Sequence, residues 1–264
     1  MDGRCLRGAA VAFTLAVLSA GSHAKAETLG IVLMHGKQGR PAQFENIAAG
    51  LESAGYLAER PEMCWSRERI YDMPYLDCFK DVDAAVEKLK SRGATAIVIG
   101  GMSLGGNGAL GYGARHPGLK GVVAFAPAHA PQFISQRPRI AESLERARAM
   151  IAKGDGDTKA TFNDVNTTRD GQIEYTVNVT PRVYLSFFAP DSPAVMPANA
   201  AKLSAPLLMI SGRQDETQRG AYALFQAVPA HPLNRFVSVE SPHIGTPAAG
   251  REAMMAWLKE LTAR

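Results

Sequence analysis

The chain has little cysteine, few aromatic side chains and no long run of one charge. Among its 264 residues three are cysteine and 7% are aromatic. It contains neither a block of lysine and arginine nor a basic stripe interleaved with aromatic residues, so it offers no footprint for nucleic-acid binding. Its N-terminal apolar run, about a dozen residues long, falls short of the roughly 20 that a bilayer-spanning helix requires. Nucleic acid and a stable membrane anchor are therefore disfavoured as partners.

Hydrophobic residues are present in the proportion expected of one large domain. They make up 46% of the chain, and charged residues make up 20%. These proportions fit a single core in a folded chain of this length. No internal repeat, low-complexity tract or linker interrupts the sequence. We therefore expect one domain over residues 27–264.

The first 26 residues have the layout of a cleavable secretory signal. Arg4 and Arg7 precede an apolar stretch over about residues 9–20, and small residues follow as far as Ala26. Cleavage after Ala26 removes three basic residues and one acidic residue, which lowers the formal charge from +4 to +2. We expect a nearly neutral mature protein that is periplasmic or secreted.

The two cysteines that remain after such cleavage, Cys64 and Cys78, are expected to form a disulfide. They lie close in sequence in a chain bound for an oxidising compartment, where disulfides persist. A free thiol pair and a pair of metal ligands are the alternatives. Neither cysteine belongs to a C-x-x-C pair with a second ligand cluster, so no metal site is predicted.

Short apolar runs alternate with stretches of helical periodicity, which is typical of a parallel sheet covered by helices on both faces. We expect an α/β fold built from these elements. The predicted strands are 29–34, 56–62, 95–99, 121–126, 206–210 and 235–239. The predicted helices are 41–54, 81–91, 104–114, 218–227 and 248–261.

The alternation breaks over residues 131–201, which we interpret as an insertion that forms a lid over the carboxyl edge of the sheet. An amphipathic helix begins at Pro138, and strict alternation over 173–179 predicts a half-buried strand. Asp170-Gly171 before that strand favours a hairpin turn. Residues 181–188 are apolar enough for a buried helix.

Four aromatic residues of this insertion are candidates for a substrate pocket. They could line an acyl-binding surface, or they could only anchor the insertion to the domain, and the sequence does not separate the two interpretations. The four are Phe133, Tyr184, Phe187 and Phe188.

Ser103 is the candidate nucleophile. It lies in Gly101-Met102-Ser103-Leu104-Gly105, directly after the apolar run 96–99 and directly before a predicted helix. At a junction between strand and helix, the small residues of a G-x-S-x-G pattern permit a turn that lifts the serine hydroxyl clear of the sheet. The alternative is a glycine-rich turn with an incidental serine.

A serine hydroxyl needs a base and an orienting acid to act as a nucleophile. Asp215 follows the predicted strand 206–210, and His243 lies in the loop after the strand 235–239. Asp215 could instead cap a helix, and Glu216 or Glu240 could replace it as the acid. The rival histidines are less well placed, because they end a helix, precede a strand or begin the insertion: His116, His231 and His129.

The donors for a developing oxyanion are predicted to be two backbone N–H groups, those of Lys37 and Leu104. The first predicted strand ends in Met34-His35-Gly36, so Lys37 follows at the edge where ligands bind in open α/β sheets. His35 precedes a glycine in this turn, and we expect it to hold the loop by hydrogen bonds rather than to act as a base.

These motifs, in the chain order Ser103, Asp215, His243, resemble the α/β-hydrolase family, and the likeness spans essentially all of the mature chain. The similarity is to serine esterases, lipases and dienelactone hydrolases. It implies an eight-stranded, mostly parallel sheet, no cofactor, and hydrolysis through an acyl-serine intermediate. Lys37 departs from the aromatic or small residue that related enzymes often carry there, and its ammonium group is expected to influence which substrates are accepted.

The predicted function is therefore an exported serine hydrolase that acts on carboxylic esters, with a small-molecule ester or acyl compound as its partner. Peptidase, thioesterase and lactonase activities on the same three residues stay open, as does a non-catalytic binding protein of the same fold. A dinucleotide site is disfavoured. Although Gly106 to Gly111 match G-x-G-x-x-G, they fall inside the predicted helix, and no acidic residue occurs at 122–128.

Overall fold

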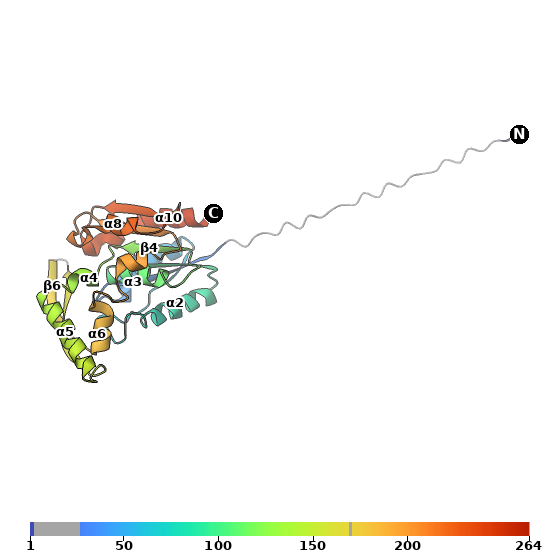
Figure 1. Ribbon diagram of the computed structural model, residues 1–264. Helices are drawn as coiled ribbons and strands as arrows, with labels where there is room; N and C mark the ends of the chain where they lie inside the picture. The colour runs from blue at the N-terminus through green and yellow to red at the C-terminus, as the bar shows by residue number, and fades with distance from the viewer. Residues whose placement is uncertain (3–26, 169–170, 264) are drawn as a thin grey trace.

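The computed structural model describes residues 1–2, 27–168 and 171–263 (Figure 1). The predicted signal segment lies outside these residues, apart from its first two positions. In the described part of the chain, no helix has the length and apolar character to span a membrane.

A sheet of six parallel strands forms the centre of the fold, in the order β2-β1-β3-β4-β7-β8. The strands are β1 (Leu29–Met34), β2 (Leu57–Glu59), β3 (Ala96–Met102), β4 (Gly121–Phe125), β7 (Leu207–Gly212) and β8 (Arg235–Val239). The predicted parallel sheet is confirmed, although the described residues give it six strands where the family resemblance implied eight. The predicted strand 56–62 is shorter in the structure: β2 has three residues, lies at an edge of the sheet and pairs with β1.

Helices cover both faces of this sheet, as the alternating pattern predicted. Alternate residues of β1 face opposite cores: Val32 and Met34 belong to one, Ile31 and Leu33 to the other. The first core is covered by α2 (Phe79–Ser91) and α3 (Leu104–Gly113), and the second by α1 (Glu45–Ser53) and α10 (Arg251–Thr262). Two shorter helices follow β7 and β8, namely α8 (Ala221–Gln226) and α9 (Thr246–Ala249).

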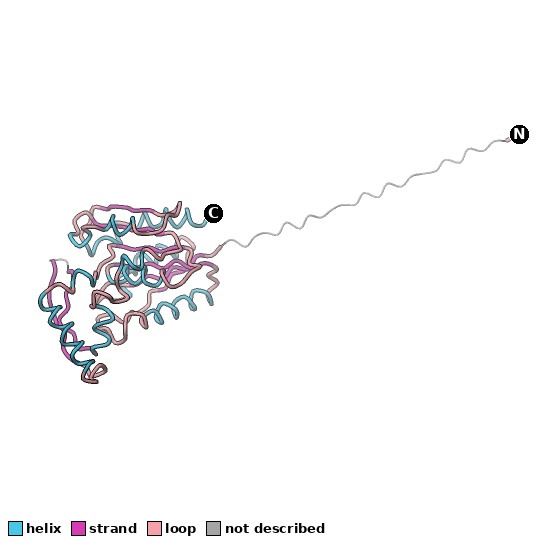
Figure 2. The backbone as a smooth tube through the Cα atoms, in the orientation of Figure 1, coloured by secondary structure: helices cyan, strands magenta, loops and turns pink. Residues whose placement is uncertain are grey.

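Residues 131–201 form a group of elements outside the sheet. Figure 1 shows α5, β6 and α6 gathered at one side of the molecule, away from α8 and α10. The group comprises α4 (Pro131–Ile134), α5 (Pro138–Ala152), β5 (Ala160–Thr168), β6 (Gly171–Val179), α6 (Pro181–Phe188) and α7 (Met196–Ala200). In Figure 2 the antiparallel β5–β6 hairpin runs beside α5, where the backbone N–H of Asn163 donates to the Ser143 hydroxyl at 3.0 Å.

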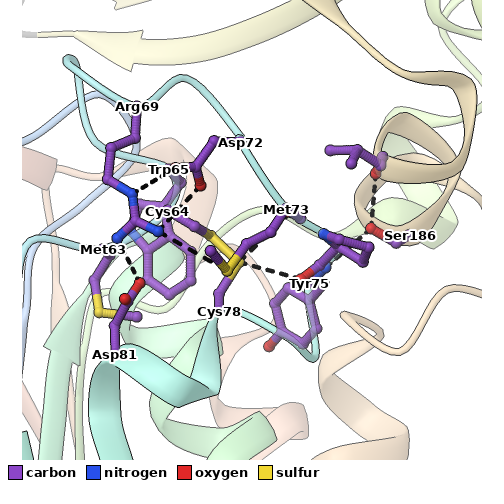
Figure 3. The surroundings of a disulfide bond; sticks show 12 residues. Met63, Cys64, Trp65, Arg69, Asp72, Met73, Tyr75, Cys78, Asp81 and Ser186 are labelled. Carbon is purple, nitrogen blue, oxygen red and sulfur yellow. Dashed lines mark hydrogen bonds and ion pairs between the residues drawn. A yellow bond between two sulfur atoms is a disulfide. The ribbon is translucent and has the colours of Figure 1, made fainter. Parts of the chain in front are cut away.

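The Cys64–Cys78 disulfide (Figure 3) closes a segment that contacts the loop after β1. The two Cα atoms are 5.5 Å apart. Inside the segment, Trp65 donates its indole N–H to the carbonyl of His35 at 2.9 Å, and its own carbonyl accepts from the N–H of Gln38 at 2.9 Å. The disulfide segment therefore supports the loop that follows β1.

We expect loss of this disulfide to lower the free energy of unfolding by about 3 kcal/mol, because the cross-link restricts a loop of about 15 residues in the unfolded chain. Urea unfolding with and without dithiothreitol measures the effect. The control is Cys64→Ala/Cys78→Ala, whose midpoint should be low and insensitive to the reductant. An unfolding midpoint of the unmodified protein that does not move on reduction would contradict the expectation.

Candidate active site

Ser103 lies at the sharp turn between β3 and α3. Its backbone has φ 56°, in the left-handed region that a non-glycine residue rarely adopts. A hydrogen bond from the N–H of Ser103 to the carbonyl of Phe125, at 3.0 Å, joins the turn to the end of β4. A Cβ at Gly105 would lie 2.1 Å from the carbonyl oxygen of Met34. The turn thus requires glycine at 105 and brings Ser103 against the end of β1.

His243 and Asp215 lie beside this serine. Nε2 of His243 is 3.0 Å from Oγ of Ser103, and Nδ1 is 2.5 Å from Oδ2 of Asp215. Because an ionised carboxylate only accepts, the Nδ1–H group donates to Asp215, and Nε2 is left to accept from the serine hydroxyl. The structure thus brings the three predicted residues into one hydrogen-bonded chain, and all three side chains are buried.

The carboxylate of Asp215 has further partners. Oδ1 accepts from the N–H and the hydroxyl of Thr217, at 3.0 and 2.7 Å. Burial raises the pKa of Asp215, but hydrogen bonds and charge from His243, together with the bonds from Thr217, outweigh burial and bring it below its ordinary value. The stability that comes with ionised Asp215 is therefore present above the ordinary pKa of an aspartate and is lost as the pH falls through the lowered one.

Asp215 also caps the short 3-10 helix Glu216–Gln218, so the capping role and the contact with His243 belong to the same side chain. The two acids considered as replacements are exposed and paired elsewhere. Glu216 contacts Arg219 at 3.2 Å, and Glu240 contacts Arg213 at 2.7 Å.

The loop after β1 lies directly against Ser103. A Cβ built at Gly36 would be 3.3 Å from Cβ of Ser103. The N–H of Gly36 donates to Oε1 of Gln43 at 2.8 Å. Within the described residues, neither the Lys37 nor the Leu104 backbone N–H donates a hydrogen bond. These two amides are therefore available as donors at this end of β1 and α3.

The Lys37 side chain does not present a free charge to the site. Its Nζ donates to Oδ1 of Asp164 at 2.6 Å and to the carbonyl of Val165 at 2.7 Å. The ammonium group is paired with Asp164, and its influence on which substrates are accepted stays a prediction.

His35 has a structural role, as expected. Its Nδ1–H donates to the carbonyl of Gly36 at 2.8 Å, and Nε2 accepts from the N–H of Met63 at 3.1 Å. Burial, the largest effect, lowers the pKa of His35. A neutral ring with both nitrogens engaged holds the loop in place and is not free to transfer a proton.

Two cavities meet at Ser103. One, of about 340 Å³, extends past His129, Phe133 and Arg137, and the other, of about 460 Å³, extends past Gln43 and Ile244. Both are lined by Lys37, Ser103, Asn166 and Thr167. A more apolar groove of about 350 Å³ continues from the first cavity between α4, α7 and α8. The residues shared with that cavity are Pro127, Ala130, Phe133, Met196 and Thr217.

Of the four aromatic residues predicted for a pocket, only Phe133 lines these cavities in the described part of the chain. Tyr184, Phe187 and Phe188 are buried in the core, where Tyr184 stacks on Phe188 with ring centroids 4.4 Å apart. These three residues therefore anchor the insertion to the domain, because the apolar face of α6 is turned toward the core rather than toward Ser103.

Sequence reasoning missed Asp164, which lies on β5 and is completely buried. An acidic residue between the apolar Phe162 and Val165 was the available signal, because a buried carboxylate requires a partner. Its cationic partner is 127 positions away, and no sequence pattern connects the two. The described residues contain no group of three or more His, Cys, Asp or Glu side chains that could hold a metal ion.

Comparison with known proteins gives one family match. Residues 25–237 match the family described as serine aminopeptidase, S33. The matched range includes Ser103 and Asp215 and ends before His243.

Solved structures with the same fold include several hydrolases. A carboxyl esterase from Bacillus coagulans has a TM-score of 0.64 at 16% identity, covering 89% of this chain and 91% of the esterase. DcsB, solved with a substrate analogue, has a TM-score of 0.67 at 15% identity, with 91% and 92% covered. A structure from a study of the metagenome-derived lipolytic enzymes LipS and LipT has a TM-score of 0.62 at 17% identity, and the match covers 89% of this chain and 95% of the compared chain. At these identities the likeness shows the fold.

We expect Gly105→Ala to lower the free energy of unfolding by about 3 kcal/mol or more, because the added methyl group would overlap the Met34 carbonyl and the backbone would have to shift. Urea unfolding measures this. Gly50→Ala in α1 is the matched control, since its methyl group would meet only the movable guanidinium of Arg251 while helix propensity improves. Equal stability of the two variants would show that β1 and α3 can separate without loss.

Proposed function

We propose that this chain, which belongs to the serine aminopeptidase (S33) family of α/β-hydrolases, is a serine hydrolase that cleaves carboxylic esters through an acyl-serine intermediate. The observation that carries the proposal is the hydrogen-bonded chain from Ser103 through His243 to Asp215, in which the distances are 3.0 and 2.5 Å. A serine hydroxyl paired with a base, and a base oriented by a buried carboxylate, is the arrangement that activates a serine nucleophile.

In the first half of the reaction, Oγ of Ser103 attacks the ester carbonyl carbon while Nε2 of His243 takes the hydroxyl proton. Asp215 holds the ring and stabilises the imidazolium that forms. The N–H groups of Lys37 and Leu104 hold the oxyanion of the tetrahedral intermediate. The intermediate collapses when its bond to the alkoxy oxygen breaks, and His243 returns the proton to the departing alcohol.

In the second half, His243 takes a proton from water, whose oxygen attacks the acyl carbon. A second tetrahedral intermediate forms and uses the same two amides. Its collapse breaks the bond to Oγ of Ser103, the serine recovers a proton from His243, and the carboxylic acid leaves. The protein thus returns to its starting state, with water as the one co-reactant.

Esters are favoured over peptides with a free amino terminus by the charge of the site. No carboxylate is among the described residues that line the cavity of about 340 Å³. Of its ionisable lining residues, Lys37 is paired with Asp164, burial lowers the pKa of His129 to about 3, and Arg137 lies 3.7 Å from Glu174. Asp164, close by, is fully engaged by Lys37 and two tyrosines. Nothing in that cavity therefore compensates the positive charge of a peptide amino terminus.

We propose export to the periplasm or beyond on the basis of the signal-like residues 1–26 and the Cys64–Cys78 disulfide. A protein of this kind forms its disulfide only after it has left a reducing cytoplasm.

The proposed function is tested by a fluorophosphonate probe and by a panel of p-nitrophenyl esters assayed beside thioester, lactone and aminoacyl substrates. We expect the probe to attach to Ser103, and Ser103→Ala or His243→Ala to lower turnover by about 10⁴-fold or more. Glu240→Gln, which changes an exposed acid, is the control and should retain turnover. Probe labelling without turnover of any substrate would favour a binding protein, and turnover by Ser103→Ala would refute the proposed nucleophile.

The apolar groove between α4, α7 and α8 gives a second expectation, on acyl-chain length. Ala223 lines the groove from the exposed side of α8, so Ala223→Trp should fill it without disturbing the core. We expect kcat/KM for an octanoyl ester to fall about tenfold to a hundredfold, and that for an acetyl ester to stay within about threefold, because each methylene that loses its apolar contact forfeits about 0.8 kcal/mol.

The control for the groove variant is Ala256→Trp on the exposed side of α10, which covers the other face of the sheet. It should leave both esters unaffected. Equal losses on the acetyl and octanoyl esters in Ala223→Trp would show that the acyl chain does not lie in this groove.

A further inference from the structure

An ion pair joins the loop after β1 to the β5–β6 hairpin, and it is almost completely removed from solvent. The side chains of Lys37 and Asp164 are 5% and 0% exposed, and Nζ lies 2.6 Å from Oδ1. A charge at such a position is unfavourable unless it is paired and hydrogen-bonded. The contacts that satisfy both groups therefore fix the relative position of the two segments.

Every strong acceptor of Asp164 is engaged. Oδ1 accepts from Lys37 and from the N–H of Val165 at 2.6 Å, and Oδ2 accepts from the hydroxyls of Tyr71 at 2.9 Å and of Tyr175. Burial first, and then the neighbouring carboxylate, raise the pKa of both tyrosines, so their hydroxyls remain protonated donors. Tyr175 is the cross-strand partner of Asp164 in the hairpin, and Tyr71 belongs to the disulfide segment.

The Lys37 ammonium is equally constrained. It donates to Asp164 and to the carbonyl of Val165, and it lies 5.3 Å from the centre of the Phe188 ring on α6. Burial lowers the pKa of Lys37, and the carboxylate of Asp164 acts against that effect. Removal of either charged group would leave the other buried without a counter-charge.

Both ends of this pair continue directly to Ser103. On one side, Gly36 packs against Ser103, and Lys37 carries the amide to which we assign the oxyanion. On the other side, Asn166 and Thr167, two and three residues after Asp164, line both cavities together with Ser103. A shift of the pair would move a proposed oxyanion donor and a cavity wall at the same time.

We propose that Lys37 and Asp164 are positioning residues: their buried ion pair holds the β5–β6 hairpin beside Ser103 and fixes the loop that presents the Lys37 amide. This inference rests on the proposed function for its kinetic consequence, whereas the coupling between hairpin and loop does not depend on catalysis. The two parts are therefore tested by separate measurements.

The coupling is tested by hydrogen exchange on the full mature chain with Lys37→Met and Asp164→Asn. We expect the amides of β5, β6, Gln38 and Gly39 to exchange about tenfold faster or more in either variant, and by similar factors, while amides of the central β3 stay unchanged. Asp81→Asn is the matched control, because it breaks a different ion pair, at 2.7 Å, between Arg69 of the disulfide segment and Asp81 of α2. It should not accelerate the hairpin and the loop together.

The kinetic consequence is tested by kcat and KM for p-nitrophenyl acetate. We expect kcat to fall about tenfold to a hundredfold in each single variant while KM stays within about threefold, because a displaced oxyanion donor affects the transition state more than substrate binding. In the double variant Lys37→Met/Asp164→Asn, kcat should be no lower than in the less active of the two single variants, since the two residues act through one contact. Asp81→Asn should keep the kcat of the unmodified protein.

The outcomes separate the two proposals. An unmodified protein that neither reacts with a fluorophosphonate nor hydrolyses an ester refutes the proposed function, while the exchange experiment still decides the coupling. Active, folded single variants with unchanged kcat and unchanged exchange overturn the positioning role, and so does a multiplicative loss in the double variant. If Lys37→Met does not fold, Lys37→Gln, which keeps a donor but removes the charge, takes its place under the same criteria.

Discussion

The close approach of two backbones, at the turn after β3 and at the end of β1, is the contact on which the site depends. Gly105 lies so near the carbonyl oxygens of Met34 and His35 that no side chain fits between them. This approach sets Ser103 beside the loop that carries Lys37. The hydroxyl group of Ser103 and the backbone N–H group of Lys37 are thereby held beside each other by main-chain packing rather than by flexible side chains.

The parallel sheet brings the remaining groups to the same edge. Asp215 and His243 follow β7 and β8, which are neighbours in the sheet, and the carboxyl ends of parallel strands meet at one side. Residues separated by 140 positions, such as Ser103 and His243, therefore come within hydrogen-bond distance without a special connection. The elements of 131–201 then add what the sheet lacks, namely walls for the cavities and the acidic partner of Lys37.

How much of this was predictable from the sequence depends on how local each signal is. The strands around Ser103, Asp215 and His243 are short apolar runs bounded by glycine or polar residues, so their positions and order could be read directly. The depth of α6 could not, because an apolar helix of eight residues does not reveal which element it faces, and Tyr184, Phe187 and Phe188 proved to be core residues. The Lys37–Asp164 pair was out of reach for a related reason, since burial of both groups is a property of the assembled fold. The family resemblance implied two further strands in the sheet, but no apolar run in this sequence predicted them.

The backbone conformation of Ser103 also links the stability of the fold to the position of a hydroxyl group. A non-glycine residue at φ 56° holds conformational strain of about 1 to 3 kcal/mol, which surrounding contacts such as the bond to the Phe125 carbonyl must offset. A glycine at this position would relieve the strain and raise the free energy of unfolding, but it would also remove the hydroxyl group. The hydroxyl group and the most relaxed backbone therefore exclude each other at this position, and variants selected for thermal stability alone are expected to lose the hydroxyl group.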